Sequence, residues 1–409
     1  MIFNFFLILF FFLVFNHLKM GKCQSKRTKS QIIKSRTYDQ EKTSVISGNI
    51  ENTTKKEKIV KNANNNNDND ETENGNYILS KFYLIEKNLN EKLRIININQ
   101  YNEKSLKDNI KIYINNIEIP LTNKYAFTDL NDDEIKIKSK IPLDNISYLF
   151  HNCQNLIEVN FSNFNSSNLK NIKCLFSQCI FLNKINFSKL STENIIDMSG
   201  LFFYCSSLVE LNLSDIKTNN VTNMCGMFEN CTSISKLNLS NFNTNKVIDM
   251  SNMFHNCSKI TNLNLSSFNT NNVLYMNGMF NNCCKLVNLN VSSFDTNKVE
   301  NMNSMFCKCC ALENLELDSF KTQNVKDMGE MFSNCIFLKK LELYNFTTKK
   351  VTNMKMMFYE CQFLDELEIS NFKINENTDI SDIFKGLNSN CEIEVHDKRL
   401  CKIINENNL

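Results

Sequence analysis

Hydrophobic and polar positions repeat with a constant period along most of the chain. One phenylalanine column recurs every 26 residues, with no insertion or deletion, at Phe150, Phe176, Phe202, Phe228, Phe254, Phe280, Phe306, Phe332, Phe358 and Phe384. Similar units at a fixed period of this size are typical of a solenoid, in which each unit packs against its neighbours. Residues 147–387 are therefore predicted to form an array of nine 26-residue repeats.

The pattern within one repeat predicts a strand followed by a helix. Ile260–Leu265 has the spacing L-x-x-L-x-L, whose last two leucines share one face of a strand. Apolar residues in Val273–Cys283 recur at spacings of three, three, one and three, which indicates a helical stripe. Asn or Asp precedes the first Met of this stripe in eight of nine repeats, as a helix N-cap requires. The predicted fold class is a right-handed α/β repeat solenoid with one parallel strand and one short helix per unit.

The segments that flank the array differ from it. Residues 77–146 alternate apolar and polar residues, for example in Ile110–Ile119, and are predicted to form a small β cap over the first repeat. Residues 388–409 are predicted to cap the other end, with a closing strand in Cys391–Val395. Residues 20–76 are basic and Asn-rich, and are predicted to be a disordered tether because they have too few apolar groups to fold.

The N-terminus supports two interpretations. Residues 1–19 carry an apolar run, Ile2–Phe15, which is long enough for a signal-peptide core but short for a membrane span. If Met20 is instead the start, the chain begins MGKCQS, in which Gly21 is a candidate for myristate and Cys23 for palmitate. The first interpretation predicts a secreted or cell-surface protein. The second predicts a lipoprotein at the cytoplasmic face of a membrane, where the basic residues that follow would strengthen anchoring.

Charge along the predicted strands changes near the end of the array. The exposed strand column is Asn in six repeats and Glu in the last three. A strand face of a solenoid is a common binding surface, so the acidic end is predicted to bind a basic protein partner. A face that is merely solvated is the alternative. The candidate partner-binding residues are Glu316, Asp318, Glu342, Tyr344, Glu366 and Glu368.

Nine of the 17 cysteines form one column of the repeat: Cys153, Cys179, Cys205, Cys231, Cys257, Cys283, Cys309, Cys335 and Cys361. They are predicted to be buried thiols, because helices packed roughly 8–10 Å apart would keep equivalent cysteines too far apart for disulfides. A local cluster at Cys283, Cys284, Cys307, Cys309 and Cys310 leaves a redox or soft-metal site as an alternative. Its spacing matches no zinc signature.

Motifs for catalysis are missing from the sequence. It contains no phosphate-binding loop, no G-x-S-x-G, no H-E-x-x-H and no kinase signature. The chain is therefore predicted not to be an enzyme, with no catalytic residues, no cofactor, no metal, no small-molecule substrate and no nucleic-acid partner.

The repeat M-x-x-M-F-x-x-C-x-x-L-x-x-L-x-L-S-x-F-x-T-x-x-V, from about Ile146 to Leu387, resembles the BspA-type leucine-rich repeat families. Many bacterial members of those families have tryptophan where this chain has Phe242, Phe268, Phe294 and Phe320. The resemblance implies a leucine-rich-repeat-like solenoid that binds other macromolecules. It also implies a surface or secreted location in many bacterial members, several of which are thought of as adhesins, and it supplies no catalytic residues.

Together these features predict a non-catalytic protein–protein interaction scaffold that is tethered to a membrane surface by its N-terminus. A secreted or cell-surface adhesin-like protein is the alternative. A thiol redox or metal-binding protein is the third hypothesis.

Overall fold

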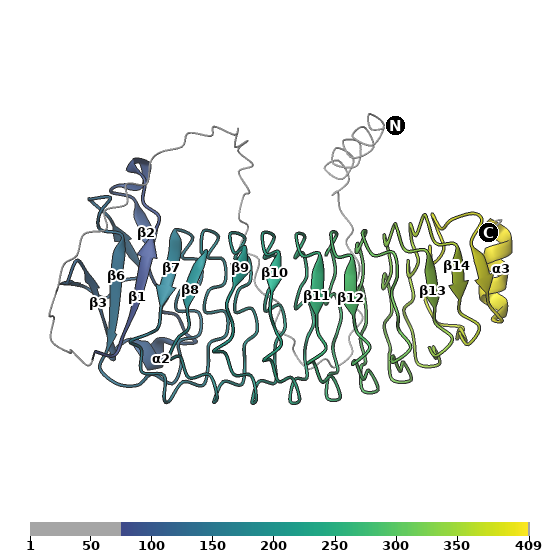
Figure 1. Ribbon diagram of the computed structural model, residues 1–409, viewed down its shortest axis with the longest axis horizontal. Helices are drawn as coiled ribbons and strands as arrows, with labels where there is room; N and C mark the ends of the chain where they lie inside the picture. The colour runs from purple at the N-terminus through teal and green to yellow at the C-terminus, as the bar shows by residue number, and fades with distance from the viewer. Residues whose placement is uncertain (1–74, 408–409) are drawn as a thin grey trace. The chain divides into compact units, whose positions relative to one another are not determined.

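The computed structural model of this protein describes residues 75–407. In Figure 1 the repeats stack side by side along one axis, and the strands of successive repeats run alongside each other. The segment 1–19 and the lipidation candidates Gly21 and Cys23 lie outside the described residues. Within residues 75–407, no helix has the length and apolar character needed to cross a membrane.

The elements before the array are β1 (Tyr77–Phe82), η1 (Glu86–Asn88), β2 (Lys92–Arg94), α2 (Glu103–Leu106), β3 (Ile110–Ile114), β4 (Ile117–Ile119), β5 (Lys124–Ala126) and β6 (Glu134–Ser139). The first five strands of the array are β7 (Leu156–Asn160), β8 (Lys184–Asn186), β9 (Glu210–Leu211), β10 (Lys236–Leu237) and β11 (Asn262–Asn264). The rest are β12 (Asn288–Asn290), β13 (Lys340–Glu342), β14 (Glu366–Glu368), β15 (Glu392–Glu394) and α3 (Lys398–Asn407).

The N-terminal strands continue directly into the array. One sheet has the order β4-β3-β6-β1-β7-β8, in which β1 pairs antiparallel with both β6 and β7. Strand β7 belongs to the first repeat and pairs parallel with β8 of the second. Ile78 and Phe82 on β1 are buried at 1% exposure. The first repeat is therefore covered by a strand that extends its own sheet.

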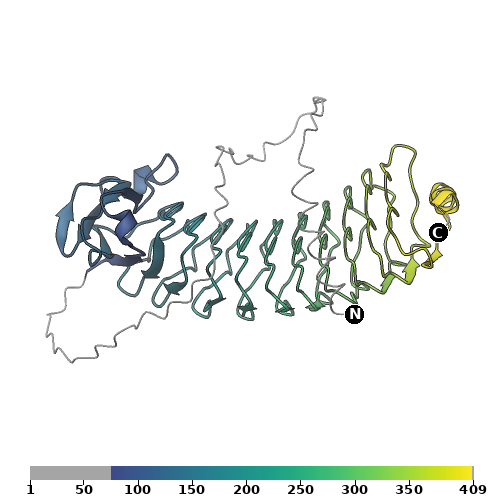
Figure 2. The same cartoon turned by 90° about the horizontal axis from the view of Figure 1, so that it is seen from above.

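Short strands of the array pair with their equivalents in neighbouring repeats in four groups: β7 with β8, β9 with β10, β11 with β12, and β13 with β14 and β15. Between β11 and β12, for example, Leu263 pairs with Leu289 in a parallel register. A second parallel ladder of single bridges runs without a break from Asn145 to Asp379 along the Asn/Asp column. Figure 2 shows the short strands along one edge of the stacked coils and loops along the opposite edge. These pairings confirm the predicted repeat solenoid with a 26-residue spacing.

The predicted short helix in each repeat is wrong. Between β7 and β15, the described residues contain no helix, and the stretch after each Asn or Asp forms consecutive turns. Asn252 and Asn256 have φ values of 55° and 58°, which a right-handed helix excludes. Alternate N–H groups leave the repeat: Phe254 N–H donates to Met279 O at 2.9 Å, in the next coil. A helix would need those donors for its own carbonyls.

The interior is built from columns of identical side chains. Phe254 and Phe280 are fully buried, and their rings stack with centroids 5.8 Å apart at an interplanar angle of 6°. The column threonines join neighbouring coils: Thr244 Oγ1 donates to Asn269 O and accepts from Asn269 N–H, both at 2.8 Å. Each coil therefore depends on its neighbours for hydrogen-bond partners and for ring stacking, which is why one repeat cannot fold alone.

Candidate interaction surface

The asparagine column at the strand ends closes turns. In each of six repeats, the Asn Oδ1 accepts the backbone N–H of the serine two residues later, as Asn264 does from Ser266 at 3.0 Å. This is an Asx turn, in which the side chain takes the place of a backbone acceptor. The six residues are Asn160, Asn186, Asn212, Asn238, Asn264 and Asn290. These asparagines, four of them exposed and two half-buried, therefore have a structural role.

Glutamate replaces this asparagine in the last three repeats. Glu368 keeps the turn, because its Oε1 accepts Ser370 N–H at 3.1 Å and also the Ser370 hydroxyl. Its Oε2 is buried and accepts no hydrogen bond. Within residues 75–407, no such turn bond forms at Glu316 or Glu342. At two positions, then, a carboxylate has replaced a turn-closing amide.

Strands β13, β14 and β15 arrange charged residues in a grid. In the parallel register, Lys340, Glu366 and Glu392 form one row, and Glu342, Glu368 and Glu394 form the other. We call these six residues the acidic grid. It has one lysine and five glutamates, and it lines a shallow hollow of about 440 Å³.

Lys340 neutralises only part of the acidic grid. Its Nζ lies 2.8 Å from Glu366 Oε2 and 3.1 Å from Glu342 Oε1. These hydrogen bonds, the one to Glu366 first, raise the pKa of Lys340 above its ordinary value, so the lysine stays charged. Side chains directly opposite one another on neighbouring strands are close enough for like charges to destabilise the sheet. The surplus carboxylates are thus a cost to folding.

Tyr344 and Asp318 lie beside the acidic grid. The Tyr344 hydroxyl donates to Asp318 Oδ1 at 3.0 Å, across one repeat, and this bond raises the pKa of Tyr344. Glu316 is exposed in a repeat whose residues 313–317 form no strand. The structure therefore brings Glu342, Glu366 and Glu368 into one sheet and joins Tyr344 to Asp318.

Glu392 and Glu394 belong to this surface but were not among the predicted site residues. Both residues lie after Leu387, where the predicted array ends, so they were not compared with the equivalent positions of the repeats. The signal that could have found them is the alternation Glu-Ile-Glu in the predicted closing strand, which places both carboxylates on the face opposite Ile393.

An exposed aromatic pair precedes β13 and β14. Phe337 and Phe363 are 43% and 51% exposed, and their rings stack at 5.5 Å. Each stands three residues before its strand's first residue, Lys340 or Glu366. The equivalent Phe181 in an early repeat packs on Tyr83 with ring centroids 5.7 Å apart. The pair at the acidic end has no such cover among the described residues, and sequence reasoning missed it.

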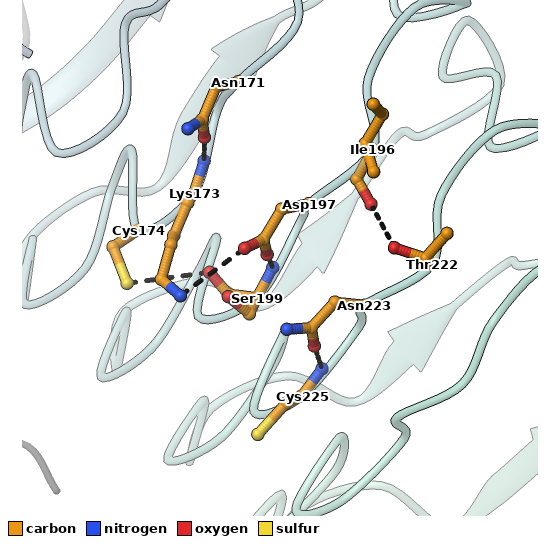
Figure 3. Close-up of polar contacts among 9 residues, drawn as sticks. All are labelled: Asn171, Lys173, Cys174, Ile196, Asp197, Ser199, Thr222, Asn223 and Cys225. Atoms are coloured by element: carbon orange, nitrogen blue, oxygen red, sulfur yellow. Dashed lines mark hydrogen bonds and ion pairs between the residues drawn. The ribbon is translucent and has the colours of Figure 1, made fainter. Parts of the chain in front are cut away.

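The turn side uses its polar groups internally. Figure 3 shows three Asx turns in successive repeats, in which Asn171, Asp197 and Asn223 accept the N–H groups of Lys173, Ser199 and Cys225 at 2.8–2.9 Å. Lys173 Nζ also lies 3.4 Å from Asp197 Oδ2. The Asn/Asp column, predicted to cap helices, therefore closes turns through the same oxygen atom.

The column cysteines are buried, and the eight thiols from Cys179 to Cys361 each donate to a phenylalanine carbonyl of the preceding repeat. Cys257 Sγ donates to Phe228 O at 3.2 Å, and burial raises the pKa of Cys257 well above its usual range. Neighbouring coils are joined by backbone hydrogen bonds, so the predicted helix-to-helix spacing, and the argument from it against disulfides, is wrong. Across residues 75–407, no group of three or more His, Cys, Asp or Glu residues is placed to hold a metal ion.

Comparison with protein families identifies a match over most of the array. The family described as "Mycoplasma protein of unknown function, DUF285" matches residues 124–236, 203–315 and 283–395. The chain belongs to this family. The three matches together span about two thirds of the 409 residues, and successive matches begin 79 and 80 residues apart, close to three repeats. A search of curated proteins finds no match.

Proposed function

We propose that this DUF285-family protein is a non-catalytic interaction scaffold whose acidic grid binds a basic segment of a partner protein. The observation that carries the proposal is the presence of five glutamates and a single lysine in register on three paired strands. The grid has a net charge of −4, and its potential extends over a Debye length of about 8 Å at physiological salt. Lysine and arginine side chains would relieve the repulsion between the carboxylates.

The replacement of asparagine by glutamate supports a binding role. Asn at this position closes a turn, whereas Glu342 and Glu316 give up that bond and add charge. A surface that only needed to be soluble would keep the asparagine, which is already polar. Residues that weaken the fold locally are typical of functional sites.

The exposed aromatic pair supports a mixed polar and apolar partner. Exposed aromatic residues that rim a charged surface are typical anchors of protein interfaces, where a few aromatic side chains supply much of the binding energy. We propose that Phe337 and Phe363 receive an apolar side chain of the same basic segment.

The scaffold's location is a second part of the proposal. Gly21 and Cys23, with the basic residues after them, fit a doubly acylated membrane anchor if translation starts at Met20. The BspA-type resemblance and the Ile2–Phe15 run favour a secreted or surface adhesin instead. Mass spectrometry of the native N-terminus separates them, because a myristoylated Gly21 supports the anchor and a terminus cleaved after Phe15 supports secretion.

Binding can be tested with the full chain and synthetic peptides. The probe is a peptide that alternates lysine with phenylalanine, compared with a glutamate–phenylalanine peptide of equal length. The variant Glu366→Gln/Glu368→Gln/Glu392→Gln/Glu394→Gln should bind the lysine peptide at least tenfold more weakly, with a smaller salt dependence. The control Glu86→Gln/Glu91→Gln changes exposed glutamates before the array. Equal affinity of the four-site variant and the control would overturn the proposal.

A further inference from the structure

Two half-buried thiols occupy equivalent positions in neighbouring repeats. Cys284 and Cys310 each follow a column cysteine and are 26 residues apart. Both are free thiols of intermediate exposure, whereas the nine column cysteines are buried. They differ from the column in being open to a reagent in solution.

Backbone hydrogen bonds hold these two repeats close together. Asn282 N–H donates to Cys307 O at 2.8 Å, two residues before Cys284 and three before Cys310. Neighbouring strands joined by backbone hydrogen bonds lie about 4.8 Å apart, and the turns of these stacked coils follow the same spacing as the strands that they connect. A disulfide needs a Cα separation of roughly 4.4–6.8 Å, so neighbouring equivalent positions are within range. Burial, and then the neighbouring Cys284, raise the pKa of Cys310 above its ordinary value.

The column cysteines have the same spacing but a different environment. Their thiols donate to phenylalanine carbonyls, for example Cys283 Sγ to Phe254 O at 3.1 Å, and no solvent reaches them. The contacts of Cys284 and Cys310 are weaker: 3.7 Å to Ser258 O and 3.4 Å to Lys308 O. These bonds are given up easily on rotation about χ1.

Two other half-buried cysteines lack a partner of this kind. The positions equivalent to Cys225 in the neighbouring repeats are Ser199 and Ser251. Cys401 lies on α3, outside the array. Among the described cysteines, the pair 284 and 310 therefore combines equivalent position with partial exposure.

We propose that Cys284 and Cys310 form a cross-repeat disulfide when the protein meets a small-molecule disulfide such as oxidised glutathione. One of the two thiols loses its proton to solvent, and its thiolate attacks a sulfur of the reagent, forming a mixed disulfide and releasing one small thiolate. The second cysteine, as its thiolate, then attacks the protein sulfur of the mixed disulfide and releases the second small thiolate. Two protein thiols are oxidised, one reagent disulfide is reduced, and the two small thiolates take up the two protons.

The bridge would fasten the repeat that carries Glu316 and Asp318 to the repeat before it. Residues 313–317 form no strand, so this repeat lacks strand pairing on that edge. A covalent link close to this gap would limit separation of the two coils. Oxidation would thereby stabilise one side of the proposed binding surface.

The test uses the full chain carrying Cys23→Ser, treated with oxidised glutathione at pH 8.5 and then blocked with an alkylating reagent. Trypsin is expected to yield Ile260–Lys285 linked to Cys309–Lys321, absent without the oxidant. Cys284→Ser and Cys310→Ser should each abolish the link, whereas Cys225→Ser and Cys401→Ser should leave it. Each variant's circular dichroism confirms that it is folded.

Several outcomes would overturn the proposal. These are a link that appears only in urea, a link that survives Cys284→Ser and therefore uses the column cysteines, and stable glutathione adducts without any link. If Cys310→Ser does not fold, Cys310→Ala replaces it in the same assay.

Discussion

The thiol of Cys257 donates a hydrogen bond to the backbone carbonyl of Phe228, in the preceding repeat, across 3.2 Å. The same carbonyl accepts Cys231 N–H within its own repeat at 3.0 Å. The column cysteine therefore fills a small slot and also supplies a donor between coils. Alanine fills the slot less well and supplies no donor.

We expect Cys257→Ala to lower the free energy of unfolding by about 1–2 kcal/mol, from the lost hydrogen bond and the small cavity. Cys401→Ala is the control, because Cys401 lies on α3 and is half-buried. Urea denaturation monitored by circular dichroism measures both. A Cys257→Ala midpoint equal to that of wild type would show that the thiol contact has no energetic role.

Buried and exposed phenylalanines should respond very differently to truncation. Phe254 is fully buried in the stacked column, so Phe254→Ala should lower the free energy of unfolding by about 3–5 kcal/mol. Phe363 is 51% exposed, so Phe363→Ala should change stability by at most about 0.5 kcal/mol and should weaken binding of the lysine–phenylalanine peptide. Thermal unfolding and peptide titration of both variants check the pair. A large loss of stability in Phe363→Ala would mean that the aromatic pair supports the fold.

Replacing Glu342 with the asparagine found at this position in earlier repeats should stabilise the fold and weaken binding of the basic peptide. Glu342→Asn would give the N–H of Tyr344 the acceptor that Ser266 finds in Asn264. We expect a gain of about 0.5–1.5 kcal/mol in stability and weaker binding of the basic peptide. Glu342→Gln is the matched control: it removes the same charge without the short side chain that the turn needs. Equal stability of the two variants would contradict the turn argument.

The stability of the first repeat should depend on pH through His151. Burial, and then the positive charge of Arg94, lower the pKa of His151 to about 4, and its Nδ1 has no hydrogen-bond partner. Between pH 6.5 and 4 the unfolded chain therefore binds a proton that the folded chain does not. Stability should be complete above about pH 6.5 and fall as the pH drops toward 4, by up to about 3 kcal/mol.

His151→Gln removes this titration and should flatten the pH dependence across that range. Denaturant titrations at pH 4, 5.5 and 7 measure it. An unchanged slope in the variant would assign the acid sensitivity to other groups.

The period and the interior columns could be predicted from the sequence because constant spacing of apolar residues requires a shared interior. The helix could not be separated from the turns, because Met and Phe at spacings of three and one fit both. What distinguishes the turns from a helix is that they contain residues in the left-handed region. Gly226 and Gly278, at φ values of 59° and 63°, occupy one such position of the repeat. Glycine at a fixed position of a supposed helix was the available signal.

The acidic surface could be predicted in part. Column comparison identified Glu342 and Glu368, since they break a run of asparagines. It could not show that the asparagines close turns, because that depends on which way Oδ1 points. The stacking of Phe337 on Phe363 depends on the pitch of the coils, which the assumed helices made too large.

The Thr244–Asn269 bond recurs at the equivalent positions of successive repeats, from Thr192 to Thr348, so these junctions share one chemistry. A gene that gained or lost one whole unit would create no new kind of junction, so recombination between units would yield foldable products of different lengths. Only the two terminal segments, which meet a coil on one side alone, could not be duplicated or deleted in this way. The length of the array can thus change by duplication or loss of whole repeats, whereas the two terminal segments cannot change in this way.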